Sequence, residues 1–174
     1  IVPYNFPMLL AGWQAAAALA AGNAIIIKPS ELTSITLLMW MEAFDHLPPG
    51  LVQVLTGGAE TGARLVEHPE THAIAFTGSV PAAQAVAKAA AHRFKPTLIE
   101  ASGNDAFIVM PSADIDTAAR GAAFAAFLNC GQVCTSAERF YVHEDIYDAF
   151  VARLAQLAKE LRIGSGLEQV DIGP

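Results

Sequence analysis

The sequence predicts an α/β fold: a Rossmann-like parallel sheet, joined to the start of a second α/β domain. Two observations predict it. Short β-rich runs before residue 100 are apolar throughout, and helical patterns separate them along the chain. Strands buried on both faces have continuous apolar sequences, and the helices between them provide the crossovers of a parallel sheet. Right-handed crossovers place the carboxyl ends of the strands at one edge, where ligands of such sheets bind.

The first element is an Ala-rich helix that begins near Phe6 and ends at the turn Gly22-Asn23. No residue in 6–27 is charged, so this run is as long as a bilayer span, which needs about 20 apolar residues. The β-branched run Ile25-Ile26-Ile27 instead predicts a strand after the turn. We therefore expect a buried helix, a turn and a strand, and no membrane partner.

The later elements continue the alternation. The predicted strands are 24–28, 51–55, 72–76, 97–100, 106–110 and 138–143, and the predicted helices are 33–45, 60–67, 80–92, 113–128 and 145–161. Ser112 or Asp114 would cap the helix 113–128, and residues 163–174 are expected to form a loop. The turn-rich residues 101–105 predict a boundary between a domain at 1–100 and another at 101–174.

Composition excludes several classes of protein. The 174 residues are 53% hydrophobic and 16% charged, which excludes a disordered chain. The net charge is −7, with 10 Lys and Arg residues that form no cluster, so we expect no nucleic-acid partner. Two cysteines fit a reducing compartment and predict a cytoplasmic protein. Because the chain begins with Ile1 rather than Met, we expect an internal piece or a processed product.

The two cysteines, Cys130 and Cys134, lie four residues apart in the stretch NCGQVCTSAER. Two thiols without a nearby His/Cys cluster cannot complete a tetrahedral zinc site, so we expect no metal. A disulfide between residues four apart requires a distorted helix. A buried, inert thiol is the common alternative to a nucleophile. The cysteines alone do not decide between these interpretations.

Candidate ligand-binding residues lie at or just after the ends of three of the predicted strands. Lys28, Ser30 and Glu31 follow the strand 24–28, where they either hold a ribose or form a solvated strand end. Phe76, Gly78 and Ser79 lead into the helix 80–92, whose free N–H groups could bind phosphate or simply be capped. Gly62 belongs to a further candidate ligand loop. Glu100 ends a strand, where it is either a general base or a solvated carboxylate.

Taken together and in this order, these segments resemble the aldehyde dehydrogenase superfamily over the entire chain. The resemblance rests on Val2-Pro3-Tyr4-Asn5-Phe6-Pro7, Leu19-Ala20-Ala21-Gly22-Asn23 with Lys28-Pro29-Ser30-Glu31, Leu47-Pro48-Pro49-Gly50, Phe76-Thr77-Gly78-Ser79, Glu100, and Gly131-Gln132-Val133-Cys134. It implies a chain made of the end of the cofactor domain and the start of the catalytic domain. It also implies that whole family members are roughly three times longer and form homodimers or homotetramers.

The resemblance implies a catalytic role for three residues. Cys134 is the nucleophile that adds to the aldehyde carbon, and Asn5 donates a hydrogen bond to the developing oxyanion beside the N–H of Cys134. Glu100 activates the water that hydrolyses the thioester. The reaction implied is oxidation of an aldehyde to a carboxylic acid.

The resemblance also implies a cofactor, NAD, with NADP as a possible substitute. The residues that correspond to cofactor contacts are Tyr4, Lys28, Ser30, Glu31, Gly62, Phe76, Gly78 and Ser79. Lys28 and Glu31 match the ribose binders, and Gly78 with Ser79 matches the pyrophosphate contact. A carboxylate at Glu31 repels a 2′-phosphate, so NAD is the preferred form.

The sequence departs from the family's pattern beside the general base. The usual E-L-G-G-K reads Glu100-Ala101-Ser102-Gly103-Asn104 here, so the turn is altered while the carboxylate is kept. A retained Glu100 indicates hydrolytic rather than CoA-acylating chemistry. Residues 104–109 resemble succinate-semialdehyde-type members, and residues 132–139 resemble lactaldehyde-type members. Cys130 occupies a variable position, where it is either neutral or able to form a reversible disulfide with Cys134.

Two other functions compete with this interpretation. A truncated homologue could keep the sheet and serve as a non-catalytic structural module. A cysteine hydrolase that pairs Cys134 with a histidine is disfavoured, because none of the 5 histidines lies in a motif typical of a base. We expect the 174-residue chain alone to be poorly soluble and inactive, given its 53% hydrophobic content.

Overall fold

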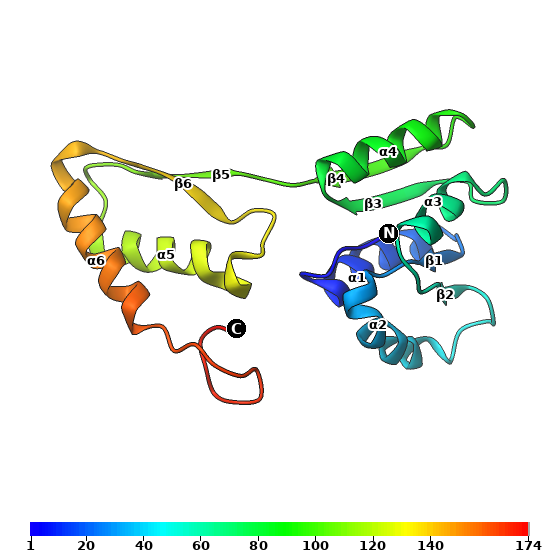
Figure 1. The fold of residues 1–174 in the computed structure, drawn as a ribbon, viewed down its shortest axis with the longest axis horizontal. Helices are drawn as coiled ribbons and strands as arrows, with labels where there is room; N and C mark the ends of the chain where they lie inside the picture. Colours follow the sequence, from blue (N-terminus) through cyan, green and yellow to red (C-terminus); the bar gives the residue numbers. More distant parts are fainter. Residues whose placement is uncertain (174) are drawn as a thin grey trace. The chain divides into compact units, whose positions relative to one another are not determined.

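The computed structural model describes residues 1–173, and these divide into two compact units, Ile1–Ser102 and Gly103–Pro174. Figure 1 shows the elements in chain order. The helices are α1 Pro7–Ala20, α2 Ser34–Trp40, α3 Ala59–Glu67, α4 Val80–Ala91, α5 Ile115–Phe127 and α6 Tyr147–Glu160. The strands are β1 Ile25–Ile27, β2 Val52–Val54, β3 Ile74–Gly78, β4 Thr97–Ala101, β5 Asp105–Val109 and β6 Ala137–Val142. The 3-10 turns are Glu31–Thr33, Met41–Phe44, Leu128–Gly131 and Glu144–Ile146.

The strands pair in parallel, as the sequence predicts. Within residues 1–173 they form three two-stranded sheets, β1–β2, β3–β4 and β5–β6. A helix or helical segment connects the two strands of every pair, since a parallel pair needs a crossover rather than a hairpin. The predicted α/β class with parallel strands is therefore confirmed.

The first two residues lie between the two strand pairs of the first unit. The N–H of Val2 donates to the carbonyl of Lys28 at 3.0 Å, directly after β1. On the other side, the Ile1 amino group donates to the carbonyl of Ala75 in β3 at 2.8 Å, and the N–H of Thr77 donates to the Ile1 carbonyl at 3.1 Å. Burial and the neighbouring Lys28 lower the pKa of this amino group from 8.0 to about 6. The two pairs expected as one sheet are thus bridged by the start of the chain.

The helices of the first unit cover these strands with two clusters of apolar side chains. One cluster joins α1 and α2 to the β1–β2 pair and includes Leu10, Ala15, Ile27, Leu37 and Val52. The other lies between α3, α4 and β3 and includes Val66, Ile74, Phe76, Ala83 and Ala90. Small alanines let the helices approach the strands closely, which the Ala-rich sequence allows.

The ends of the helices follow from local sequence. Pro7 occupies the first turn of α1, where a missing N–H costs nothing, and the chain leaves the helix through Gly22 at φ +79°. The predicted helix 33–45 is observed as the short α2, flanked by the 3-10 turns Glu31–Thr33 and Met41–Phe44. Asp114 is the N-cap of α5: its carboxylate accepts the N–H of Thr117 at 2.9 Å.

In the second unit, α5 and α6 pack against one face of the β5–β6 pair (Figure 1). Alternate residues of the two strands, Phe107 and Val109 with Phe140 and Val142, belong to the core on this face. The intervening Ile108 and Tyr141 are opposite each other in the register and are exposed. This alternation is the period of a strand with one covered face.

The core of the second unit depends on Phe150 of α6, which is 1% exposed and packs with Val109, Ala119 and Ala122. We expect Phe150→Ala to lower the free energy of unfolding by about 3–5 kcal/mol, because it leaves a cavity among small alanines that cannot close it. Urea denaturation of the chain followed by circular dichroism measures this loss. Phe124→Ala is the matched control, since that ring on α5 is 66% exposed; equal losses in both variants would contradict the packing described.

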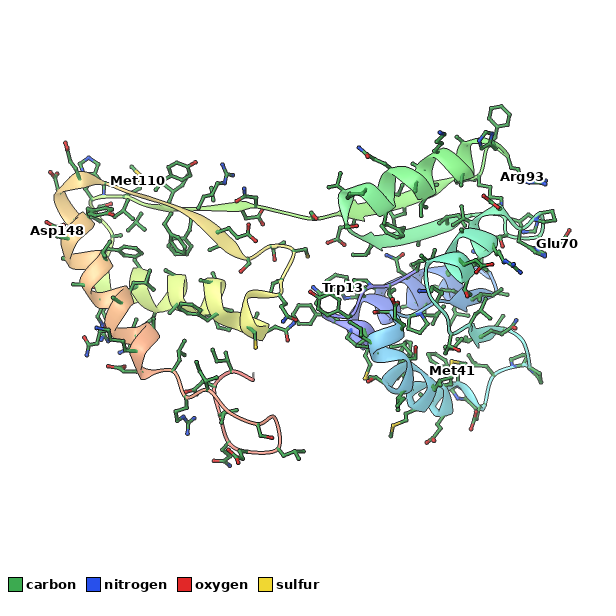
Figure 2. The ribbon with its side chains drawn as sticks, in the orientation of Figure 1. Trp13, Met41, Glu70, Arg93, Met110 and Asp148 are labelled. Atoms are coloured by element: carbon green, nitrogen blue, oxygen red, sulfur yellow. The ribbon has the colours of Figure 1, made fainter. Side chains whose placement is uncertain are left out.

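Apolar side chains also lie on the surface. Trp13 of α1 and Met110 after β5 project outward in Figure 2, and both are exposed. Leu32, Ile35 and Met39, around α2, are exposed as well. Apolar surface of this kind favours association. Over residues 1–173, every helix is too short or too polar to cross a membrane.

Candidate active site

The predicted ribose-binding residues lie together after β1. Lys28 is only 6% exposed, and its ammonium lies 3.9 Å from the Glu31 carboxylate, whose side chain is 66% exposed. Between them, the Ser30 hydroxyl accepts the N–H of Leu32 at 3.3 Å and starts a 3-10 turn that holds Glu31. A buried cation next to an exposed carboxylate presents a donor and an acceptor side by side, which suits a diol.

Gly62 of α3 packs beside the same lysine. A Cβ built on Gly62 would lie 3.9 Å from Cδ of Lys28 and 3.7 Å from the Ile1 side chain. The buried alkyl chain of Lys28 thus passes directly over the backbone of α3 at this glycine. The sequence placed Gly62 in a candidate ligand loop; the structure places it within α3, in contact with the predicted ribose-binding lysine.

The second group of residues marks the junction of β3 and α4. Gly78 ends β3, and Ser79 is the N-cap residue of α4 with extended backbone angles. A Cβ on Gly78 would lie 2.7 Å from the Phe76 ring, so the ring occupies the space that a side chain would need. Ser79 makes no side-chain hydrogen bond to cap the helix. The strand end, the glycine and the start of a helix provide backbone N–H groups for an anionic ligand.

Glu100 is placed by the register of the β3–β4 pair. It lies opposite Thr77, and Ala101 lies opposite Gly78, so Glu100 belongs to the same sheet edge as the start of α4. The side chain of Glu100 is exposed. Tyr4 and Asn5 come shortly after Val2, which is hydrogen-bonded to Lys28; Tyr4 is exposed, and Oδ1 of Asn5 is shielded from solvent. Lys28, Gly78 and Glu100 therefore lie at the carboxyl ends of β1, β3 and β4, whereas Tyr4, Asn5 and Gly62 do not.

Cys134 lies in the second unit, in a loop between α5 and β6. Three successive residues that lead into this loop, Asn129, Cys130 and Gly131, have positive φ angles of 52°, 59° and 74°. The left-handed conformation is costly for Cys130 and better tolerated by Asn129, and it turns the chain sharply away from the axis of α5. Within the described residues, the two cysteines are not joined by a disulfide; Cys130 is exposed and Cys134 is half-buried.

The loop is anchored just after the candidate nucleophile. Ser136 is 3% exposed, and its hydroxyl donates to the carbonyl of Ala125 in α5 at 3.0 Å. Its N–H donates to the carbonyl of Val133 at 3.0 Å, which closes a tight turn around Cys134. Sequence reasoning missed Ser136. Its position two residues after a candidate nucleophile was the available signal, but a serine so placed does not by itself indicate burial.

The structure thus brings the predicted residues together in two groups. Lys28 with Ser30, Glu31 and Gly62 forms the first, and Phe76 with Gly78, Ser79 and Glu100 forms the second, both in the first unit. Asn5 and Glu100 belong to the first unit and Cys134 to the second. Within residues 1–173, no group of three or more His, Cys, Asp or Glu side chains could hold a metal ion.

These residues fit a dinucleotide. The Lys28–Glu31 pair offers hydrogen bonds to a ribose diol, and the start of α4 offers N–H groups and a positive dipole to a pyrophosphate. Gly78 keeps the backbone free of a side chain at this point, where the Phe76 ring already lies. The donor set is therefore suited to a nucleotide cofactor rather than to a metal.

Comparison with known proteins identifies the family of the chain. Residues 1–174 match the model described as the aldehyde dehydrogenase family. The chain is 44% identical over 178 residues to phenylacetaldehyde dehydrogenase from Pseudomonas fluorescens, covering 100% of this chain and 36% of that protein. Solved structures agree: lactaldehyde dehydrogenase from Escherichia coli has a TM-score of 0.94 at 35% identity, over 98% of this chain and 37% of that one. PnpE in complex with nicotinamide adenine dinucleotide has a TM-score of 0.90 at 41% identity, over 93% and 34%. The chain spans about a third of the length of these relatives.

Proposed function

Because the chain belongs to the aldehyde dehydrogenase family, we propose that the whole protein oxidises an aldehyde to a carboxylic acid with a nicotinamide cofactor. One observation carries the proposal: a single family match extends over the segments around Asn5, Glu100 and Cys134. These three side chains are an amide, a carboxylate and a thiol, which together supply an oxyanion donor, a base and a nucleophile.

In the first half of the reaction, the Cys134 thiolate attacks the aldehyde carbon and forms a thiohemiacetal. The side-chain amide of Asn5 and the N–H of Cys134 donate hydrogen bonds to the oxyanion that develops, a kind of stabilisation that is typically worth several kcal/mol. A nicotinamide cofactor, which Lys28, Glu31, Gly78 and Ser79 would hold, would supply the acceptor for the hydride from this carbon. The substrate is then held on Cys134 as a thioester.

In the second half, Glu100 removes a proton from a water molecule that attacks the thioester carbonyl. The tetrahedral species collapses, the C–S bond breaks, and the carboxylic acid leaves with the Cys134 thiolate restored. The covalent route divides one difficult oxidation into two easier steps.

For the cofactor, we propose that Lys28 and Glu31 bind the adenosine ribose and that Gly78 and Ser79 contact the pyrophosphate, with Tyr4, Ser30, Gly62 and Phe76 lining the same site. The carboxylate of Glu31 is exposed, and it would repel a 2′-phosphate. The cofactor proposed is therefore NAD, with NADP as the weaker alternative. We further propose that the whole protein is cytoplasmic and forms a homodimer or homotetramer.

The proposal is tested by incubating the whole protein with a panel of aldehydes and either NAD or NADP, and following the absorbance of the reduced nicotinamide. We expect oxidation of at least one aldehyde and a higher kcat/KM with NAD. The 174-residue chain on its own, assayed in parallel, is expected to be inactive. A whole protein that binds NAD but reduces it with no aldehyde of the panel would overturn the proposal.

A further inference from the structure

Gly103, two residues before β5, lies directly against the main chain of Cys134. A Cβ built on Gly103 would collide with the carbonyl oxygen of Cys134, and it would lie 3.0 Å from the carbonyl carbon. Gly103 does not have a left-handed backbone conformation. The glycine is therefore required here for space and not for its φ angle.

Arg139 of β6 holds the next residue, Asn104. Its Nε donates to the main-chain carbonyl of Asn104 at 2.9 Å. The same guanidinium is oriented by Tyr141: Nη1 donates to the phenol oxygen at 3.3 Å, and the charged carbon lies 5.9 Å from the ring centroid. Arg139 is exposed, but its hydrogen bond to the Asn104 carbonyl and its position over the Tyr141 ring give the guanidinium a defined orientation.

The strand register supports this attachment. The β5–β6 pairing is regular from Ala106, which lies opposite Arg139, to Val109. Between Asp105 and Ala106 it shifts, so that Asp105 lies opposite Ala137 and one residue of β6 is skipped. A bulge of this kind re-aims the chain at the end of a strand pair. Here it occurs next to Gly103, which packs against Cys134, and next to Asn104, which Arg139 of β6 holds.

The peptide group of Cys134 is therefore confined from two sides. Gly103 packs against its carbonyl, and Ser136 attaches the following residues to α5 through a 3.0 Å hydrogen bond. Because a peptide is planar, fixing the carbonyl of Cys134 fixes the next N–H as well and limits the rotation of the Cys134 backbone. That backbone determines the directions of the Cys134 thiol and of its own N–H.

We propose that Gly103 and Arg139 are positioning residues for the nucleophile: Gly103 by leaving room for the Cys134 carbonyl, and Arg139 by holding Asn104, and with it Gly103, in place. The inference rests on the proposed function, in which the thiol and N–H of Cys134 must both face the aldehyde. Neither residue touches the substrate. Both act by fixing the main chain that carries the reacting groups.

The test uses the whole protein and the variant Gly103→Ala, with Gly166→Ala as its control. Gly166 lies in the same unit, has no left-handed φ and has open space where a Cβ would be placed. We expect Gly103→Ala to lower kcat about 100-fold, as displacements of about 1 Å do, while the KM for NAD changes less than about twofold. The control should retain the kcat of the wild type.

Arg139→Lys and Arg139→Ala test the second residue, with Arg64→Lys and Arg64→Ala as controls. Arg64 is exposed and pairs with Glu60 one helical turn away in α3. We expect Arg139→Ala to lower kcat about tenfold, since a charge-assisted hydrogen bond to a carbonyl is lost. The kcat of Arg139→Lys should lie between that of the wild type and that of Arg139→Ala. An ammonium can donate the hydrogen bond but cannot stack on Tyr141 as a guanidinium does.

A second readout separates this inference from the proposed function. The rate at which iodoacetamide alkylates Cys134, followed by mass spectrometry of its peptide across a pH range, requires neither aldehyde nor cofactor. We expect a changed rate and a shifted pH profile in Gly103→Ala and not in Gly166→Ala. If the whole protein oxidises no aldehyde, the proposed function fails and this readout still decides the inference. An unchanged alkylation rate together with an unchanged kcat in Gly103→Ala would overturn the inference. If Gly103→Ala does not fold, the alkylation rate and kcat of Arg139→Ala decide it instead.

Discussion

Replacing Cys134 with alanine is expected to abolish aldehyde oxidation by the whole protein while leaving NAD binding intact. The thiol supplies the only covalent attachment in the proposed route, and removing a nucleophile of this kind typically lowers kcat by about 10⁴-fold or more. The cofactor contacts proposed, from Lys28 to Ser79, lie in the first unit, whereas Cys134 lies in the second. Turnover is measured with the best aldehyde, and NAD affinity by quenching of tryptophan fluorescence.

Cys130→Ala is the matched control, because it makes the same change four residues earlier in the same loop. Cys130 is exposed, and its thiol donates to the carbonyl of Gly173 at 3.6 Å. Alanine accepts the φ of 59° no better or worse than cysteine, so the loop should keep its shape. We expect turnover within about twofold of the wild type. Loss of turnover in Cys130→Ala, or unchanged turnover in Cys134→Ala, would contradict the assignment of the nucleophile.

The elements that could be predicted are those fixed by local sequence. The apolar runs predicted strands at 97–100 and 106–110, and the structure has β4 at Thr97–Ala101 and β5 at Asp105–Val109. The helix predicted at 80–92 is α4, Val80–Ala91. Asp114, one of the two residues proposed as N-cap, makes the capping hydrogen bond. Periodicity and capping are properties of neighbouring residues, so the sequence contains them directly.

The features that escaped prediction depend on residues far apart in the chain. The bridging of β1 and β3 by Ile1 and Val2 involves hydrogen bonds to Lys28 and Ala75 that no periodicity reveals. The close approach of Gly103 to the Cys134 carbonyl joins positions that the chain separates by a strand and a helix. The left-handed conformation of Cys130 is also unexpected, since cysteine, unlike glycine or asparagine, rarely adopts it. Tertiary packing imposes all three.

The candidate site likewise contains some features that could be predicted from the sequence and others that could not. The Lys28–Glu31 contact spans three residues and could be expected from their spacing. The placement of Glu100 opposite Thr77 follows once β3 and β4 are known to pair in parallel. The burial of Lys28 against Gly62 could not be expected, because it depends on how α3 packs. That Asn5, Glu100 and Cys134 act on one substrate stays a prediction. Glu100 offers its sharpest kinetic test.

Glu100→Gln is expected to slow hydrolysis of the thioester far more than transfer of the hydride. Glutamine keeps the size of the side chain and its place opposite Thr77 in the β3–β4 register, but it cannot accept a proton from water. The first turnover should therefore release reduced nicotinamide at nearly the normal rate, and later turnovers should wait for hydrolysis. We expect a burst of about one equivalent per active site, followed by a steady rate about 10²–10⁴-fold below that of the wild type.

Stopped-flow absorbance with an aldehyde in excess measures both phases in one experiment. Glu70→Gln is the control, since it makes the same neutralising change at an exposed residue between α3 and β3, away from the strand ends. Raising the pH offers a second check: added hydroxide attacks the thioester without a base, so the steady rate of Glu100→Gln should rise with pH more steeply than that of the wild type. A burst phase and a steady phase slowed by equal factors would show that Glu100 acts before the thioester forms, and its assignment as the base for hydrolysis would then be wrong.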